Sequence, residues 1–231
     1  MRNVISIFLL LIIVNCHAQF KKDPLINLEN FDKQTVHWGY FLGFNSYDFK
    51  FDYKVPGEDI LVKKTTGFSV GLVGNLRLHE YVDLRFEPGL YYTQRDLTFT
   101  NPDLVTELDK LRAVKSTYIH FPLLLKFSSL RTGNVRPYLL GGVSTTLNLS
   151  SGSKSEDDNL EARFRMKPWT NNYELGFGVD LYFEYFKFSP SIRGVFGLGD
   201  EIIRDNDPNS PWTGNVHKMS TRAIMVNFTF H

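Results

Sequence analysis

Residues 68–93 read FSVGLVGNLRLHEYVDLRFEPGLYYT, and apolar and polar residues alternate along two arms of this stretch. The arms meet at a very short turn, His79-Glu80-Tyr81. Period-two alternation on both sides of a tight turn is typical of a long β-hairpin. Its polar face carries four charged residues close together: Arg77, Asp83, Arg85 and Glu87. A soluble sheet would show that face to water, whereas a membrane barrel would enclose it and present the apolar face to lipid.

The same alternation predicts six further strands, which with the two hairpin arms makes eight. The arms cover residues 68–78 and 82–93, and the other strands cover residues 36–53, 117–127, 136–149, 172–183, 186–198 and 220–230. Every predicted strand has at least the roughly 9–11 residues that a tilted membrane strand needs. Short and long connections alternate along the chain, as they do in outer-membrane barrels. The sequence therefore predicts an all-β fold for residues 36–231, an eight-stranded antiparallel transmembrane β-barrel with long external loops and short periplasmic turns.

Four long connections are expected to be the external loops, at residues 54–64, 95–115, 150–168 and 199–218. In the second, Leu104, Leu108 and Leu111 have helical spacing, which favours a short helix. Three prolines fall within predicted strands, where each removes a ladder hydrogen bond: Pro88, Pro122 and Pro190. We expect bulges there, or positions near strand ends.

A soluble lipocalin-type barrel is the alternative fold. Such a barrel has apolar residues inside and no need of charged side chains that face the lumen. The alternation of loop lengths and the aromatic-rich last strand favour the membrane barrel, since that strand must close against the first and remove both sheet edges.

Residues 1–18 resemble a Sec signal peptide that is cleaved after Ala18. Arg2 supplies the positive n-region, and residues 4–14 form an apolar core that is too short to span a membrane. The alternatives are a buried helix or a lipoprotein anchored at Cys16, although the residues before Cys16 make a poor lipobox. We expect residues 19–35 to be a short periplasmic tail.

The composition narrows the function classes. The chain has 231 residues with a formal net charge of +1, which gives no reason to expect nucleic acid as a partner. Its only cysteine lies inside the predicted signal peptide, so the mature chain would have no disulfide, thiolate chemistry or cysteine-ligated metal. We predict an exported, integral outer-membrane protein whose surroundings are outer-membrane lipids.

Charged residues on the inward face of the predicted barrel are the first functional candidates. By parity they are Arg77, Asp83, Arg85, Glu87, Lys126, Glu174, Asp180, Lys187 and Arg193. An eight-stranded barrel has little room inside, so we expect these side chains to interdigitate as a charge-paired plug without an open pore. Their signs nearly balance, as mutual neutralisation requires. The functional alternative is a path for protons or ions.

Three other features could indicate a catalytic or metal site, but each gives only a weak signal. Residues 67–71 match the nucleophile-elbow pattern Gly-x-Ser-x-Gly, but Ser69 falls in a strand and not at a strand-to-helix turn. A weak metal candidate is the set Asp205, Asp207 and Asn209, which has calcium-loop spacing but lacks the later glycine and glutamate. His120 is interpreted as a wall residue with satisfied hydrogen bonds. We therefore expect no catalytic residues, no cofactor and no enzymatic activity.

Several short segments resemble the PorT family of outer-membrane barrels of Bacteroidota, also called SprT in gliding species. They are residues 38–45 (WGYFLGFN), 48–51 (DFKF), 87–91 (EPGLY), 118–126 (YIHFPLLLK) and 136–142 (RPYLLGG). The resemblance covers essentially the whole mature chain. It implies a component of the type IX secretion system, which exports proteins across the outer membrane and supports gliding motility, with other secretion components as partners. No catalytic residue is carried over from the family.

Two other functions stay open on the sequence. A barrel of the same fold could have an adhesive or envelope-stabilising role, with acidic loops that meet lipopolysaccharide or Ca²⁺. A barrel enzyme acting on lipids would need a Ser–His pair at the rim, and parity supports none.

Overall fold

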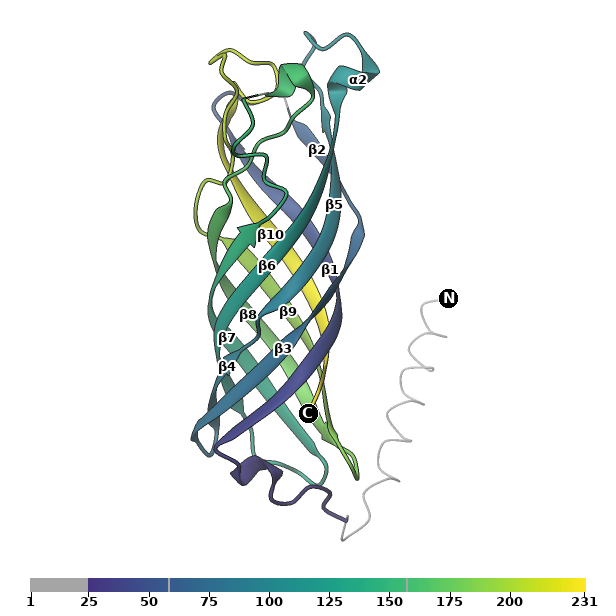
Figure 1. The fold of residues 1–231 in the computed structure, drawn as a ribbon, viewed down its shortest axis with the longest axis vertical. Coiled ribbons are helices and arrows are strands. Elements are labelled where there is room, and N and C mark those ends of the chain that lie inside the picture. The colour runs from purple at the N-terminus through teal and green to yellow at the C-terminus, as the bar shows by residue number, and fades with distance from the viewer. Residues whose placement is uncertain (1–24, 58, 157) are drawn as a thin grey trace, which may run out of the picture.

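The structure is a computed structural model, and it describes residues 25–57, 59–156 and 158–231. The predicted signal peptide, residues 1–18, and the beginning of the predicted tail, residues 19–24, lie outside the described residues. The described chain forms an elongated antiparallel sheet rolled into a barrel, with loops gathered at one end and residues 25–35 at the other (Figure 1).

The sheet contains ten strands. They are β1 (Val36–Tyr53), β2 (Ile60–Lys64), β3 (Thr66–His79), β4 (Val82–Phe86), β5 (Gly89–Phe99), β6 (Leu111–Ser128), β7 (Val135–Asn148), β8 (Trp169–Tyr182), β9 (Lys187–Gly197) and β10 (Val216–Phe230). Strand β1 pairs with both β10 and β3, so the pairings close into a ring. Strands β4 and β5 lie end to end between β3 and β6, and together they occupy one strand position of the ring. Strand β2 pairs only with β5, at the long-loop end. Eight barrel strands result, as predicted.

Pro88 divides β4 from β5 without disturbing the barrel. Gly74 pairs with Phe86 before the break and Gly71 pairs with Gly89 after it, so β3 keeps one register across the gap. The carbonyl of Pro88 still accepts a hydrogen bond from the backbone N–H of Leu72, at 3.0 Å. The register also continues unchanged through Pro122 and Pro190. The expectation of bulges or strand ends holds for Pro88, which lies between the end of β4 and the beginning of β5, and for Pro190, three residues after β9 begins. Pro122 lies within β6 without a bulge, because the neighbouring pairs hold the register.

The strands reach further toward the long-loop end than the sequence predicted. Residues 60–64, expected in a loop, form β2. Both ends of the connection expected at residues 95–115 are strand, because β5 continues to Phe99 and β6 begins at Leu111. The expected loop helix is a single turn, α2 (Glu107–Lys110). Two 3₁₀ turns complete the described elements, η2 (Phe31–Lys33) and η3 (Asn159–Glu161). None of the described helices is long and apolar enough to cross a membrane.

A belt of apolar side chains faces outward around the barrel. It includes Trp38, Tyr40, Leu42, Phe44, Leu72, Leu90, Tyr92, Leu123, Phe127, Leu139, Val143, Leu175, Phe177, Ile192 and Ile224. Trp38 alone exposes 72% of its surface. Such a continuous exposed apolar band is what a lipid-facing barrel surface requires.

Two layers fill the interior. Buried charged residues occupy the half toward the short turns, and we call them the buried charge network: Arg85, Glu87, Lys126, Glu174, Asp180, Lys187 and Arg193. Apolar residues occupy the half toward the long loops, and we call them the apolar layer: Phe49, Ile60, Leu97, Phe99, Leu104, Val114, Met166, Ile202, Trp212, Val216 and Met219.

Candidate functional site: the filled interior of the barrel

The short-turn half of the buried charge network is centred on Asp180. Its Oδ2 lies 2.5 Å from the Nζ of Lys126, and its Oδ1 accepts a hydrogen bond of 2.6 Å from the hydroxyl of Ser189. The Nζ of Lys187, the next inward residue of the hairpin strand β9, lies 3.2 Å from the Nε2 of His37. A single tight turn joins β8 to β9, and Tyr182 pairs with Lys187 next to it. Asp180 lies two residues before Tyr182 on the same inward face, so the turn brings Asp180 and Lys187 close together.

Arg193 joins the two other buried carboxylates. Its NH1 lies 2.7 Å from Glu87 Oε2, and its Nε lies 2.9 Å from Glu174 Oε2. Glu87 also contacts the Nε of Arg85, at 2.7 Å. His120 completes the group, with Nε2 at 2.6 Å from Glu174 Oε1 and Nδ1 at 2.7 Å from the hydroxyl of Thr146. The charged members come from β4, from the break that follows it, and from β8 and β9, so the network crosses the lumen and links opposite walls.

Arg95 lies above this network and has a different kind of environment. Its guanidinium is stacked on the ring of Phe49, 3.9 Å from the centroid, and it donates hydrogen bonds to the hydroxyls of Ser116 and Tyr118. The side chain is fully buried. Sequence reasoning missed Arg95 because it was placed in a loop. Its even spacing from Tyr91 and Thr93, which both face inward, is the signal that could have found it.

Residues 25–35 form a tail that closes the short-turn mouth. Asp32 accepts a hydrogen bond of 2.6 Å from the hydroxyl of Tyr182, and its carboxylate lies 3.6 Å from both Arg131 and Arg136. Arg131 also donates to the carbonyls of Asn27 and Leu28. The Phe31 ring lies beneath Lys187, 4.5 Å from its Nζ. Residues 25–35 of the predicted periplasmic tail are therefore part of the barrel floor.

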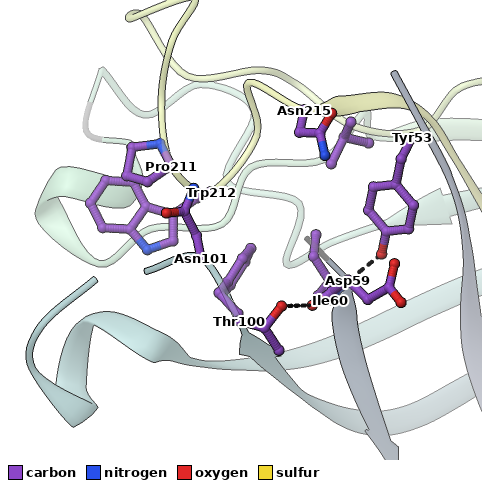
Figure 2. Close-up of a pocket in the computed structure, with 10 residues that line it drawn as sticks. Tyr53, Asp59, Ile60, Thr100, Asn101, Pro211, Trp212 and Asn215 are labelled. Carbon is purple, nitrogen blue, oxygen red and sulfur yellow. Dashed lines mark hydrogen bonds between the residues drawn. The ribbon is translucent and has the colours of Figure 1, made fainter. Parts of the chain in front are cut away.

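The long loops close the opposite mouth over the apolar layer. Figure 2 shows one crevice at this end, between Tyr53, Ile60, Thr100 and Trp212. Its volume is about 10 Å³, which is the space of a single water molecule. Trp212 seals the crevice by donating from Nε1 to the carbonyl of Asp109, at 2.8 Å. This crevice has no room for a ligand larger than a water molecule.

The family comparison fits this architecture. A family model described as "Outer membrane protein beta-barrel domain" matches residues 18–202. The chain belongs to the outer-membrane β-barrel family. No curated protein matches the sequence.

Solved outer-membrane barrels are similar to this chain in structure. The outer membrane protein OprG of Pseudomonas aeruginosa has 16% identity and a TM-score of 0.44, with 84% of this chain and 92% of that chain covered. Neisserial surface protein A, NspA, has 9% identity and a TM-score of 0.45, with 85% and 98% covered. Ail, the attachment invasion locus protein of Yersinia pestis, has 12% identity and a TM-score of 0.38, with 85% and 99% covered.

As an outer-membrane barrel, the protein has its apolar belt in the bilayer, its short turns in the periplasm and its long loops outside. Seven of the nine charged residues selected by parity make up the buried charge network. The other two, Arg77 and Asp83, also lie on the inward face, but they are half-exposed at the periplasmic mouth. Arg77 donates to the carbonyl of Lys33 in the tail. They are rim residues, because β3 ends two residues after Arg77 and β4 begins one residue before Asp83.

The weaker sequence motifs lie in unrelated environments. Ser69 is buried within β3, three residues after the strand begins, and not at a strand-to-helix turn. Among the possible calcium ligands, the carboxylate of Asp205 accepts hydrogen bonds from Ser210 and Thr213 in its own loop. It also accepts one from Asn159, which fastens this loop to the external loop between β7 and β8. In the described part of the chain, no group of three or more His, Cys, Asp or Glu residues could hold a metal ion.

Proposed function

We propose that this protein is a non-enzymatic barrel component of the type IX secretion system, and that it acts as an accessory and not as the conduit. The filled interior carries this proposal. A translocation channel for folded cargo needs a lumen much wider than eight strands enclose. Here the lumen is crossed by the Arg193 bridge, floored by residues 25–35 and roofed by the apolar layer.

The secretion role itself comes from the resemblance of residues 38–45, 118–126 and 136–142 to the PorT family. A barrel that conducts nothing contributes to export through its surfaces. We assign partner contacts to the periplasmic turns with residues 25–35 or to the packed external loops, and lipid contacts to the apolar belt. The absence of an enzymatic step agrees with the chemistry of the interior, where each buried carboxylate of the charge network contacts a cationic group.

An adhesive or envelope-stabilising role is the second candidate, and one observation favours it. The external loops share the apolar layer, which includes Leu104, Met166 and Trp212 from three different loops. A preorganised loop surface binds with a lower loss of conformational entropy than mobile loops would. This feature suits a barrel that presents a fixed surface outside the cell.

A clean deletion strain tests the proposal. We expect it to lose export of type IX cargo and surface spreading, and a plasmid-borne wild-type copy to restore both. A second copy lacking residues 25–35 would show whether the periplasmic side carries the contact. Normal cargo export in the deletion strain would refute the secretion role. If the native protein of the parent strain fractionates in the outer membrane, the second candidate would then remain.

A further inference from the structure

A groove on the outer wall of the barrel lies where the apolar belt meets the external rim. It has a volume of about 270 Å³ and is lined by Ser46, Asp48, Lys64, Gly194, Phe196, Arg222, Ala223 and Ile224. The lining comes from three neighbouring barrel strands, β9, β10 and β1, together with β2. This groove belongs to neither the interior nor the loop crevice described above.

Small residues create the groove. Ile224 pairs with Gly194 on one side and with Ser46 on the other, so a large apolar side chain stands between two small ones. A Cβ built on Gly194 would lie 3.0 Å from the ring of Phe196. The hollow therefore exists because position 194 has no side chain. Its walls, Ile224 and Phe196, are apolar, as the acyl region of a bilayer requires.

Cationic residues lie directly above the hollow. Arg222 pairs with Phe196 on β9 and with Asp48 on β1, one row further toward the external loops than Ile224. Arg222 is exposed, and within the described chain no ion pair or hydrogen bond holds its guanidinium. Lys64 reaches the same row, with its Nζ 3.2 Å from the carboxylate of Asp48. Asp48 offsets one of the two positive charges, so the row is cationic by one unit.

We propose that this groove binds one phosphorylated, acylated glycolipid of the outer leaflet, the chemical class of lipopolysaccharide. An acyl chain occupies the hollow between Ser46 and Gly194 against Ile224. A phosphate lies above it against Arg222, with Lys64 as the second contact. Guanidinium groups favour phosphate through paired N–H donors, and anionic headgroups lie at this depth of the leaflet. The inference is independent of the secretion role and stands or falls on lipid binding alone.

Lipid binding by the purified full mature chain tests this proposal. The protein, folded in detergent micelles, is titrated with bisphosphorylated lipid A, with chemically dephosphorylated lipid A and with phosphatidylethanolamine, and native mass spectrometry counts the lipids retained. We expect one retained bisphosphorylated lipid A and weaker retention of the other two. Replacing both cations, Arg222→Gln with Lys64→Gln, should lower the affinity for lipid A by about tenfold or more, because it removes charge-assisted hydrogen bonds.

Two further variants separate a site from general lipid contact. Gly194→Leu keeps every charge but fills the hollow, so it should also weaken lipid A binding. Lys115→Gln removes an exposed lysine from β6, across the ring from β10, and should leave the affinity unchanged. Retained heat-modifiable mobility on gels shows that each variant is folded. Equal retention of the three lipids, or an equal loss in Lys115→Gln and in the double variant, would overturn the proposal.

Discussion

The two halves of the barrel interior differ in chemistry although they are built on the same strands. On β1, even-numbered residues face outward along the whole strand and odd-numbered residues face inward. In the membrane half the outward residues are apolar, from Trp38 to Phe44, and polar or small residues such as His37, Gly43 and Asn45 line much of the interior. In the external half Asp48 and Lys50 face outward, and Phe49 and Phe51 face inward.

The same set of alternate residues therefore faces inward along the whole strand, but the inward side chains change from polar to apolar. The reversal follows from the medium outside the wall. Lipid accepts apolar side chains and leaves the polar ones to the lumen, whereas water above the membrane drives apolar side chains into the interior. The external half has the pattern of a soluble barrel, with apolar side chains inside. The lipocalin-type pattern, which was the alternative for the whole chain, therefore applies to this half. The position of the reversal, near Ser46 on β1, marks the external boundary of the bilayer.

Breaking the charged half should have the largest effect. Replacing Arg193 by Met leaves Glu87 and Glu174 buried without their shared cation, and we expect the free energy of unfolding to fall by about 3–5 kcal/mol. Urea unfolding in micelles, followed by tryptophan fluorescence and by gel mobility, measures the loss. Arg193→Lys keeps the charge but cannot bridge both carboxylates, so it should lie between the wild type and Arg193→Met. Equal stability of Arg193→Met and wild type would mean that water already solvates the carboxylates.

Breaking the apolar half should cost less and act locally. Leu97 is fully buried in the apolar layer, and Leu97→Ala should remove about 2–4 kcal/mol from the packing of that layer. Because the layer lies beyond the apolar belt, the loops at residues 150–168 and 199–218 should become protease-sensitive while the membrane half stays folded. Hydrogen exchange resolves the two halves. Loss of protection in the β8 residues around Glu174 as well would show that the halves unfold together.

The sequence predicted the membrane half better than the external half for the same physical reason. Between residues 68 and 93 the outward face is apolar, so the alternation predicted the strands and the parity predicted which side chains face the lumen. Beyond Thr93 the inward residues are Arg95, Leu97 and Phe99, and outward ones such as Asp96 and Thr98 are polar. A search for an apolar outward face stops there, although the strand continues. The same reversal hid β2 and the beginning of β6.

The interior site was predictable as a set of residues but not as a set of pairs. Parity selected Glu87, Glu174 and Arg193, yet nothing in the spacing says that Arg193 bridges the two glutamates across the lumen. That pairing depends on the stagger between β4, β8 and β9, which one sequence does not encode locally. Asp32 was missed because the tail has no periodicity, and its contacts with Tyr182 and Arg136 span more than a hundred residues.

Loosening the periplasmic floor should have a smaller effect than either core change. Asp32→Ala removes one hydrogen bond from Tyr182 and two partly exposed ion pairs, which together should stabilise the tail by about 1–2 kcal/mol. Residues 25–35 should then exchange amide hydrogens faster and be cleaved sooner by protease. Planar-bilayer conductance should stay at the baseline, because the buried charge network still fills the lumen. Asp32→Asn, which keeps an acceptor for Tyr182, is the matched control, and ion conductance in Asp32→Ala would show that the tail is the actual plug.

Removing a buried charge from the external half should have the smallest effect, and its sign distinguishes the two halves. Glu201 lies in the last external loop and is buried, so its pKa is raised by burial even though Thr221 donates to it from N–H at 2.7 Å and from Oγ1 at 2.6 Å. An acid whose pKa is higher in the folded state destabilises the fold when ionised, and this cost disappears as the pH falls through the folded pKa toward that of the unfolded chain. Glu201→Gln should therefore be slightly more stable than wild type at neutral pH, and the difference should shrink on acidification. Thermal unfolding of both proteins between pH 7 and about pH 4, the ordinary range of a glutamate, measures this difference.

Glu201→Ala is the control: it loses both hydrogen bonds from Thr221 and should be less stable than Glu201→Gln at every pH. If Glu201→Gln instead destabilises the protein at neutral pH, the ionised carboxylate stabilises the external half as it does the membrane half, and the contrast between them does not extend to this residue.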